Sequence, residues 1–268
     1  MIAITVVSVC YNEEKNIART IESVLAQTTT DYEYIICDGL STDATVEIAK
    51  SYQDKFAEKG ISYRVFSEKD NGIYDAMNKG IEKAQGQYMY FLNAGDWLCD
   101  EQSLSHFVQA IRKDDNPAVY YADYYYVDQH RATRVITDDA LLPQEMSLGH
   151  PSMVARTDLM RRTPFDTRYR IAADYNFVLG LKMQGLSFIR LDVATTYFLS
   201  GGLSGQAMQE TNEELRNIHM SYGLAHQDIE QAPISLKQKL VRWLIGAAPK
   251  GLWRFWTQRI KRDAWVEY

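Results

Sequence analysis

The sequence predicts an α/β fold in which a mostly parallel sheet carries helices on both faces. Along the first hundred residues, apolar β-branched runs alternate with segments whose apolar residues recur at helical spacing. A chain of 268 residues, 46% hydrophobic and 24% charged, forms one or two globular domains and can bury a sizeable core. The net charge of −6 argues against a general nucleic-acid-binding protein.

The first half of the chain supplies the parallel strands. We expect strands over residues 2–9, 34–37, 63–66 and 88–92. Between them we expect helices over 17–25, 46–49 and 74–84, the first of them capped by Asn12. The run 2–9 has no basic residue before it and is too short to span a bilayer, so it is predicted to be a strand and not a signal peptide.

Four polar residues fall just after these strands: Asn12, Asp38, Asp70 and Asp96. Because ligands of parallel α/β sheets bind beyond the carboxyl ends of the strands, we expect these side chains to meet at one edge. Asp96 could hold Mg²⁺ or Mn²⁺ against a diphosphate, since hard cations take oxygen ligands; alternatively, it is an ordinary turn residue. Asp38 could accept hydrogen bonds from a nucleobase or ribose, or it could serve as a turn or helix-capping residue.

The second half shows a mixed pattern. We expect helices over 104–111, 175–183 and 208–222, a hairpin of 119–127 with 134–137, strands over 152–155 and 188–191, and a flexible loop at 201–205. Neither an internal repeat nor a low-complexity segment is present in the sequence.

Several common cofactor and catalytic motifs are missing from the sequence. The first strand–helix turn reads Cys10-Tyr11-Asn12-Glu13-Glu14 in place of a glycine-rich dinucleotide loop. There is no Walker A lysine loop, no G-x-S-x-G elbow and no HExxH pair. Three cysteines without a CxxC pair make a zinc site unexpected and favour a reducing compartment.

Four segments share the order and spacing of a known family. They read Val7-Ser8-Val9-Cys10-Tyr11-Asn12-Glu13, Cys37-Asp38-Gly39-Leu40-Ser41-Thr42-Asp43-Ala44-Thr45, Ser67-Glu68-Lys69-Asp70-Asn71-Gly72-Ile73-Tyr74-Asp75-Ala76-Met77-Asn78-Lys79-Gly80 and Tyr90-Phe91-Leu92-Asn93-Ala94-Gly95-Asp96. Together they resemble the family-two inverting glycosyltransferases, which have a Rossmann-like GT-A fold. The resemblance covers residues 3 to about 205 and is closest to bacterial enzymes that build O-antigen, capsule or exopolysaccharide repeat units.

The resemblance implies a set of donor-binding residues. Tyr11, Asn12 and Asp38 would line the nucleobase pocket, with Asp70 at its rim, while Asn78 and Lys79 would face the nucleotide. The other expected contacts to the nucleotide sugar are Glu13, Gly39, Asn93, Ala94 and Gly95. Asp96 matches the last carboxylate of the family's DxD-type motif and would bind Mn²⁺ or Mg²⁺. Asn93 and Gly95 stand where many members carry further aspartates, so a single carboxylate predicts weak, substrate-assisted metal binding.

The segment Phe165-Asp166-Thr167-Arg168-Tyr169-Arg170-Ile171-Ala172-Ala173-Asp174-Tyr175 resembles the one that supplies the family's catalytic base. Many members have Glu-Asp where this chain has Ala173-Asp174, so the resemblance makes Asp174 the general base; alternatively, it caps a helix. His150 resembles a position near the acceptor, or it has a structural role. Gly202 and Ser204 resemble a loop that closes near the diphosphate, or they form a plain surface turn.

The carboxyl-terminal tail lies outside the resemblance. Residues 237–262 hold eight basic residues and no acidic one, whereas residues 1–236 hold 21 basic and 33 acidic residues. We expect basic amphipathic helices, divided at Pro249, that lie in the interface of an anionic membrane. The expected membrane contacts are Trp243, Trp253, Trp256, Arg242, Arg254 and Arg259. The alternative is a tail packed on the acidic body or on another subunit.

The resemblance implies a GT-A domain over 1–205 and a helical extension over 206–268. Residues 1–100 would form the nucleotide-sugar-binding half and 101–205 the acceptor and catalytic-base half. The expected reaction is metal-assisted, inverting transfer of a hexosyl or N-acetylhexosaminyl group from a nucleotide sugar, expected to be a UDP-sugar, to a polyprenyl-diphosphate-linked saccharide. The enzyme would be cytoplasmic and peripheral on the inner face of the cell membrane.

Two alternatives stay open at this point. A sugar-nucleotide pyrophosphorylase would require a glycine-rich, basic phosphate loop after the first strand, which Cys10-Tyr11-Asn12-Glu13-Glu14 does not supply. A degenerate, nucleotide-binding membrane scaffold would not need Asp96 and Asp174, both of which the chain retains. Because the DxD-type motif retains only the carboxylate of Asp96, the scaffold alternative stays open.

Overall fold

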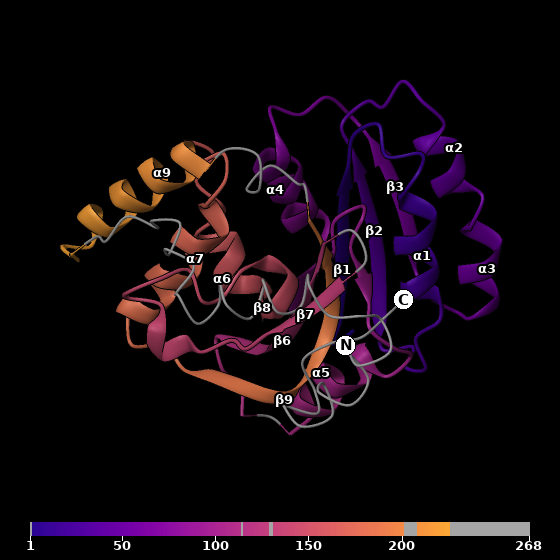
Figure 1. Cartoon of the computed structure of the whole chain (residues 1–268). Helices are drawn as coiled ribbons and strands as arrows, with labels where there is room; N and C mark the ends of the chain where they lie inside the picture. The colour runs from indigo at the N-terminus through magenta and orange to yellow at the C-terminus, as the bar shows by residue number, and fades with distance from the viewer. Residues whose placement is uncertain (1, 114, 129–130, 201–207, 226–268) are drawn as a thin grey trace, which may run out of the picture.

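A single mixed sheet organises the protein. The computed structural model describes residues 2–113, 115–128, 131–200 and 208–225. Within these ranges a nine-stranded sheet runs in the order β3-β2-β1-β4-β8-β6-β9-β5, with β7 paired to β6. Helices lie on both sides of it (Figure 1). The predicted α/β class is confirmed.

The amino-terminal half of the sheet is parallel. Its strands are β1 (Ile4–Cys10), β2 (Tyr32–Asp38), β3 (Tyr63–Ser67) and β4 (Tyr88–Phe91). β1 pairs in parallel with β2 and with β4, and β2 pairs in parallel with β3. The connecting helices are α1 (Ile17–Leu25), α2 (Thr45–Lys50), α3 (Gln53–Glu58) and α4 (Ile73–Lys83). All four strands and three of these helices match the prediction; α3 is an addition to it.

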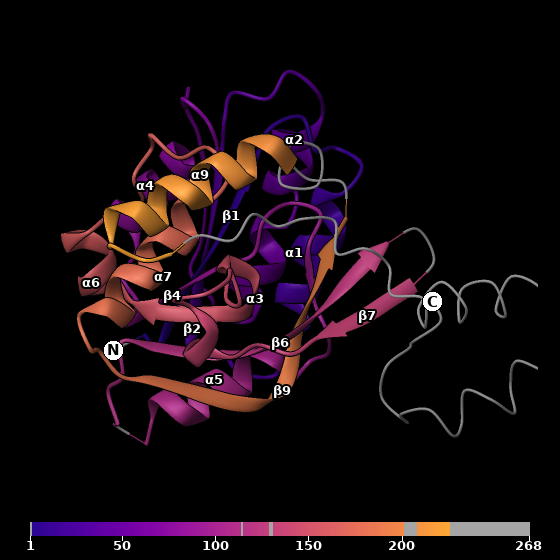
Figure 2. The same cartoon turned by 60° about the vertical axis from the view of Figure 1, so that its left-hand side comes forward.

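The second half of the sheet is largely antiparallel. It contains β5 (Trp97–Leu98), β6 (Val119–Asp128), β7 (Arg131–Val135), β8 (Met153–Arg156) and β9 (Phe188–Leu199). β8 is antiparallel to β4 and β6, β7 to β6 and β5 to β9, whereas β9 runs parallel to β6. The predicted hairpin of β6 and β7 is therefore confirmed, and Figure 2 shows it extending from the body. The helices are α5 (Ser103–Ile111), α6 (Thr157–Arg162), α7 (Ala173–Met183) and α9 (Met208–Ser221), with single 3₁₀ turns at Asp139–Leu141 and His150–Ser152.

Two hydrophobic cores form on opposite faces of the sheet. Alternate residues of β1 explain this, because side chains at successive strand positions point to opposite faces. Val7 and Val9 join the core under α4, α6, α7 and α9, while Ile4 and Val6 join the core under α1, α3 and α5. Since α9 contributes buried apolar residues to the first core, it packs on the body of the protein. Among the described helices, none combines the length and apolarity needed to cross a bilayer.

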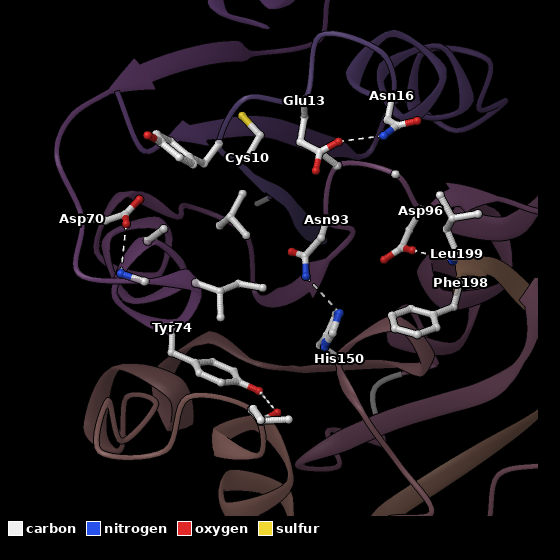
Figure 3. A pocket seen from close by; sticks show the side chains of 18 of the residues that line it. Cys10, Glu13, Asn16, Asp70, Tyr74, Asn93, Asp96, His150, Phe198 and Leu199 are labelled. Carbon is white, nitrogen blue, oxygen red and sulfur yellow. Dashed lines mark hydrogen bonds between the residues drawn. The ribbon is translucent and has the colours of Figure 1, made fainter. Parts of the chain in front are cut away.

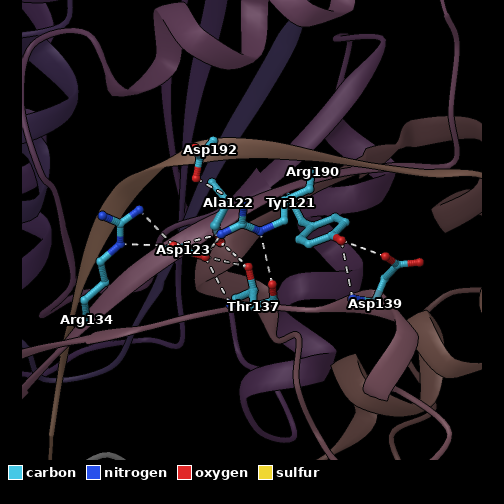
Figure 4. A network of polar contacts seen from close by, with 8 residues as sticks. All are labelled: Tyr121, Ala122, Asp123, Arg134, Thr137, Asp139, Arg190 and Asp192. Carbon is cyan, nitrogen blue, oxygen red and sulfur yellow. Dashed lines mark hydrogen bonds and ion pairs between the residues drawn. The ribbon is translucent and has the colours of Figure 1, made fainter.

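A buried carboxylate holds the antiparallel region together (Figure 4). Asp123 on β6 is fully buried and forms ion pairs with Arg134 of β7, at 2.9 Å, and Arg190 of β9, at 2.9 Å. It also accepts hydrogen bonds from the backbone N–H and the hydroxyl of Thr137, at 3.0 and 3.1 Å. One side chain thus ties together β6, β7, β9 and the segment that follows β7.

Candidate functional site

The loops at the carboxyl edge of the parallel strands enclose one large pocket (Figure 3). It is lined by residues that follow β1, β3 and β4, by the first turn of α4, and by the end of β9. Its volume of about 670 Å³ falls in the range of small-molecule sites, which run from roughly 300 to 1,000 Å³. Of the four polar residues expected to meet at this edge, Asp70 and Asp96 line the pocket, whereas Asn12 and Asp38 do not.

The structure brings about half of the predicted site residues to the pocket wall. Those that line it are Tyr11, Glu13, Asp70, Asn93, Ala94, Gly95, Asp96 and His150. Those that do not are Asn12, Asp38, Gly39, Asn78, Lys79 and Asp174. Gly202, Ser204, Arg242, Trp243, Trp253, Arg254, Trp256 and Arg259 lie outside the described residues.

Asn12 supports a loop and does not cap α1, so that prediction is wrong. The helix begins at Ile17 with Asn16 in the N-cap position. Asn12 adopts a left-handed backbone conformation, with φ of 54°, and its Oδ1 accepts a hydrogen bond from the Thr42 N–H at 2.9 Å. Asparagine adopts that conformation more readily than most residues. The bond to Thr42 connects the loops after β1 and β2.

Asp38 is the last residue of β2 and does not line the pocket. Its side chain is buried and accepts hydrogen bonds from the Ser41 N–H, at 3.0 Å, and the Ser67 hydroxyl, at 2.6 Å. The Ser41 hydroxyl also donates to it. These contacts are those of a turn-forming aspartate, which was the alternative reading of the sequence. Asp38 therefore connects the loop after β2 to the end of β3.

Three other predicted donor contacts also support loops. A Cβ at Gly39 would lie 2.4 Å from the Asp70 carboxylate, so a larger residue there would require the Asp70 side chain to move. Asn78 exchanges hydrogen bonds with both backbone groups of Phe165, at 2.9 Å each. Lys79 donates to the backbone carbonyl of Lys69. Asn78 and Lys79 therefore stabilise the surrounding loops, away from the pocket wall.

Asp96 lies on a loop that α1 holds in place. The Thr20 hydroxyl donates to the Asp96 carbonyl, at 2.7 Å, and accepts from the Gly95 N–H, at 3.1 Å. Arg19 donates to the Gly95 carbonyl at 2.9 Å. The Asp96 carboxylate is 4% exposed, and burial raises its pKa to about 7. One of its oxygens accepts from the Leu199 N–H at 2.9 Å, while the other has no hydrogen-bond partner among the described residues.

A chain of hydrogen bonds runs from α7 to the pocket. Asp174 Oδ2 accepts from His150 Nδ1, at 2.9 Å, and from the His150 backbone N–H, at 3.0 Å. His150 Nε2 and the Asn93 amide nitrogen are 3.0 Å apart. In the neutral imidazole with its proton on Nδ1, Nε2 accepts from the Asn93 amide nitrogen, and the Asn93 amide oxygen points away from His150 (Figure 3). That oxygen is buried and has no partner among the described residues.

Asp174 lies behind His150 and does not reach the pocket wall. It is 1% exposed and also accepts hydrogen bonds from the Tyr74 hydroxyl and the Tyr175 N–H, both at 2.9 Å. Burial alone would raise its pKa, but the hydrogen bonds from His150 and Tyr74 hold that pKa below its usual value. For His150, burial alone would lower the pKa, and the bond to Asp174 raises it above the usual value. His150 is therefore the titratable member of the pair that faces the pocket.

Several pocket residues were not singled out from the sequence. The Tyr74 hydroxyl lies 2.6 Å from the Ile171 carbonyl oxygen and 2.9 Å from Asp174 Oδ1, so its one proton is shared between these two acceptors. Arg170 lines the pocket from the segment before α7, and Phe198, Leu199 and Ser200 line it from the end of β9 and just beyond. Tyr74 and Arg170 lie within segments that resemble the glycosyltransferase family, so the sequence contained a signal for both residues. The β9 residues gave none, because the strand was expected to end at residue 191.

Within the described ranges, no group of three or more histidine, cysteine or acidic side chains is arranged to hold a metal ion.

Comparisons with known proteins point in one direction. A family model described as "Glycosyl transferase family 2" matches residues 5–173. The chain is 28% identical over 204 residues to a PGL/p-HBAD biosynthesis glycosyltransferase of Mycobacterium tuberculosis, covering 75% of this chain and 78% of that protein. It is 26% identical over 237 residues to the UDP-Glc:alpha-D-GlcNAc-diphosphoundecaprenol beta-1,3-glucosyltransferase WfaP of Escherichia coli, covering 84% and 89%.

The fold resembles that of a solved enzyme as well. The structure of S. aureus TarS residues 1–349 with UDP-GlcNAc superposes with a TM-score of 0.65 at 18% identity. The match covers 97% of this chain and 77% of that one. At this level of identity the likeness shows the fold alone, and it supports the predicted GT-A architecture.

Proposed function

Because the chain belongs to glycosyl transferase family 2 and is a glycosyltransferase, we propose that it transfers a sugar from a UDP-sugar to a lipid-linked saccharide with inversion at the anomeric carbon. The observation that carries this proposal is one pocket whose wall holds Asp96, Asn93 and His150, with Asp174 behind His150. The printed activity of WfaP, which acts from UDP-Glc on a diphosphoundecaprenol-linked sugar, supports both the donor and the acceptor.

We propose that Asp96 holds Mn²⁺ or Mg²⁺ when the donor binds. The carboxyl groups of Glu13, Asp70 and Asp96 all line the pocket, and a bound cation would offset their repulsion of an anionic nucleotide. Magnesium-type sites commonly use one or two carboxylates together with substrate phosphates, and Asp96 offers one free oxygen to such a site. When bound, the cation would neutralise charge on the departing nucleoside diphosphate.

The remaining pocket wall could bind the nucleoside diphosphate part of the donor. The first turn of α4 lines the pocket, and the amino-terminal end of a helix favours phosphate. We propose that Tyr11, Glu13 and Asp70 contact the nucleotide directly. Asn12, Asp38, Gly39, Asn78 and Lys79 would contribute by shaping the loops that carry these residues.

We propose that His150 and Asp174 act together as the general base. The acceptor hydroxyl would replace the Asn93 amide at His150 Nε2, so that its oxygen attacks the anomeric carbon while its proton passes to the imidazole. The bond from that carbon to the phosphate oxygen breaks, and the nucleoside diphosphate leaves. Asp174 would orient the imidazole and stabilise its positive charge, which is the role of the third group in catalytic triads.

A screen of nucleotide sugars tests the proposed function. The full chain is incubated with UDP-, GDP- and dTDP-sugars, with and without Mn²⁺, and release of the nucleoside diphosphate is measured. We expect one UDP-sugar to be consumed, and Mn²⁺ to increase its consumption.

We propose that the carboxyl-terminal extension brings the enzyme to the cytoplasmic face of the membrane. The boundary after residue 205 and the membrane role of 206–268 stay predictions, although α9 packs on α7 through its buried residues. The sequence of 237–262 carries the support, since each Lys or Arg near an anionic surface contributes about 1 kcal/mol. A location at the membrane would suit a lipid-linked acceptor.

Truncation after Pro233 should remove sedimentation with anionic vesicles while UDP binding persists, because every expected nucleotide contact lies before residue 100. Binding of the full chain should weaken from 0.1 to 1 M salt, as the Debye length falls from about 10 Å to about 3 Å. Equal vesicle binding by the full and truncated chains would contradict the membrane role. Loss of folding on truncation would instead favour a tail packed on the body.

A further inference from the structure

A single side chain of α9 holds the backbone that leads into α7. The Glu214 carboxylate accepts hydrogen bonds from three consecutive backbone N–H groups, those of Arg170, Ile171 and Ala172, at 2.7, 3.0 and 2.9 Å. One of its oxygens takes the first bond, and the other takes the second and third. Because hydrogen bonds to a carboxylate are stronger than those between neutral groups, Glu214 fixes segment 170–172 against α9.

Other contacts attach α9 to the body of the protein. Leu215 and Ile218 are buried in the core on that face of the sheet. His219 Nε2 lies 2.6 Å from the Tyr175 hydroxyl, and Figure 1 and Figure 2 both show α9 beside α7. Removing the carboxylate of Glu214 should therefore break its three hydrogen bonds without detaching the helix.

Segment 170–172 is connected to the proposed general base. The Ile171 carbonyl oxygen lies 2.6 Å from the Tyr74 hydroxyl, which is also 2.9 Å from Asp174 Oδ1. The other oxygen of Asp174 accepts from His150 Nδ1 at 2.9 Å. A shift of this backbone would move one of the two acceptors of the Tyr74 hydroxyl, and with it the hydrogen bonds that hold the Asp174–His150 pair.

We propose that Glu214 is a positioning residue for sugar transfer, because it holds segment 170–172 where the Asp174–His150 pair keeps its geometry. This inference rests on the proposed function, since Glu214 acts through the proposed base. The match to the family model ends at residue 173, so α9 lies beyond it. The catalytic unit accordingly includes α9, which follows the boundary expected after residue 205.

Glu214→Gln tests the inference through the release of UDP from the UDP-sugar that the wild type consumes. An amide nitrogen replaces one of the two accepting oxygens, so at least one backbone N–H loses its partner. We expect kcat to fall about 10- to 10²-fold, the scale of a small misplacement of catalytic groups. KM for the UDP-sugar should change little, because none of the proposed donor contacts lies on segment 170–172. A role in stability alone would leave kcat per folded molecule unchanged.

Glu213→Gln is the matched control. Glu213 is the preceding residue of the same helix, is exposed, and accepts a hydrogen bond from Gln209 within α9 at 3.2 Å. The variant makes the same change of charge one position away, so its kcat should equal that of the wild type. Glu214→Asp takes the place of Glu214→Gln if that variant does not fold. A fall in kcat with little change in KM is expected there as well, since the shorter side chain cannot span the same three N–H groups.

The NMR signal of the His150 Nδ1 proton gives a second measurement, which does not depend on activity. It is assigned by its loss in His150→Asn, and the hydrogen bond to Asp174 determines its position. We expect the same signal in the wild type and in Glu213→Gln, and a shifted or lost signal in Glu214→Gln.

Three results would overturn the inference: wild-type kcat in a folded Glu214 variant, an unchanged His150 signal in that variant, or an equal fall of kcat in Glu213→Gln. Failure of the wild type to consume any nucleotide sugar would instead count against the proposed function. In that case the His150 signal still decides whether Glu214 positions the pair, so the two failures are distinguishable.

Discussion

Replacement of His150 by asparagine should lower the rate of sugar transfer about 10²- to 10⁴-fold, the range typical for loss of a general base. Asparagine can still donate a hydrogen bond to Asp174 from nearly the position of Nδ1, but it cannot take up a proton. UDP affinity, measured by calorimetry, should change little because the hydrogen-bonded framework is kept. A His150→Asn enzyme with nearly normal transfer would show that another group accepts the proton.

Asp174→Asn tests the His150–Asp174 pair through the pH dependence of the transfer rate. The bond and charge of Asp174 raise the pKa of His150, and a base must be neutral to act, so the rate should rise with pH through that raised pKa. Without the carboxylate the pKa falls, and the rising limb of kcat/KM should move to lower pH while its plateau drops. A limb that does not move would contradict this role of Asp174, and loss of activity at every pH in a folded variant would indicate that Asp174 itself accepts the proton.

The buried carboxylate of Asp123 is expected to contribute strongly to the free energy of unfolding. Asp123→Ala should lower the free energy of unfolding by about 3 kcal/mol, near the lower end of the range for breaking a buried ion pair. The carboxylate is fully buried, and its loss leaves the Thr137 N–H without its partner. The side chains of Arg134 and Arg190 are 25% and 32% exposed, so water can partly replace the carboxylate for them.

Asp158→Ala is the matched control for this experiment. Asp158 also pairs with two arginines, Arg156 and Arg162, but its side chain is 50% exposed. Exposed pairs contribute little, so we expect a loss of no more than about 1 kcal/mol. Urea unfolding with equal m-values measures both variants, and equal losses would mean that Asp123 does not have the structural role assigned to it.

The parallel half of the fold could be predicted because its sequence signals are local. β1 and β4 are continuous apolar runs, and α1 and α4 place their apolar residues on one face. The sequence predicts a strand over 188–191, whereas β9 continues to Leu199. In the structure, Thr196 is buried and its hydroxyl is bonded to Tyr90 on another strand. A partner so distant in sequence cannot be seen from local patterns.

The candidate site, like the fold, could be predicted from the sequence only where the signal was local. The sequence places Asp96 and Asn93 directly after a strand, and the structure confirms that both line the pocket. It could not indicate that His150 stands between Asp174 and the pocket, because that relation depends on how α7 packs against the turn at His150–Ser152. Asp38 and Asn78 stand in recognised motifs, yet their side chains are used within the protein. The motifs predicted which segments lie at the site more reliably than they predicted the role of each residue.

The most direct measurement of the central claim is consumption of nucleotide sugars with and without Mn²⁺ by the wild-type chain and by Asp96→Ala. We expect the wild type to consume one UDP-sugar, Mn²⁺ to increase the rate, and Asp96→Ala to lose that increase because the only carboxylate of the DxD-type motif is gone. No consumption of any nucleotide sugar by the wild type with Mn²⁺ present, or the full increase in Asp96→Ala, would contradict the proposed function.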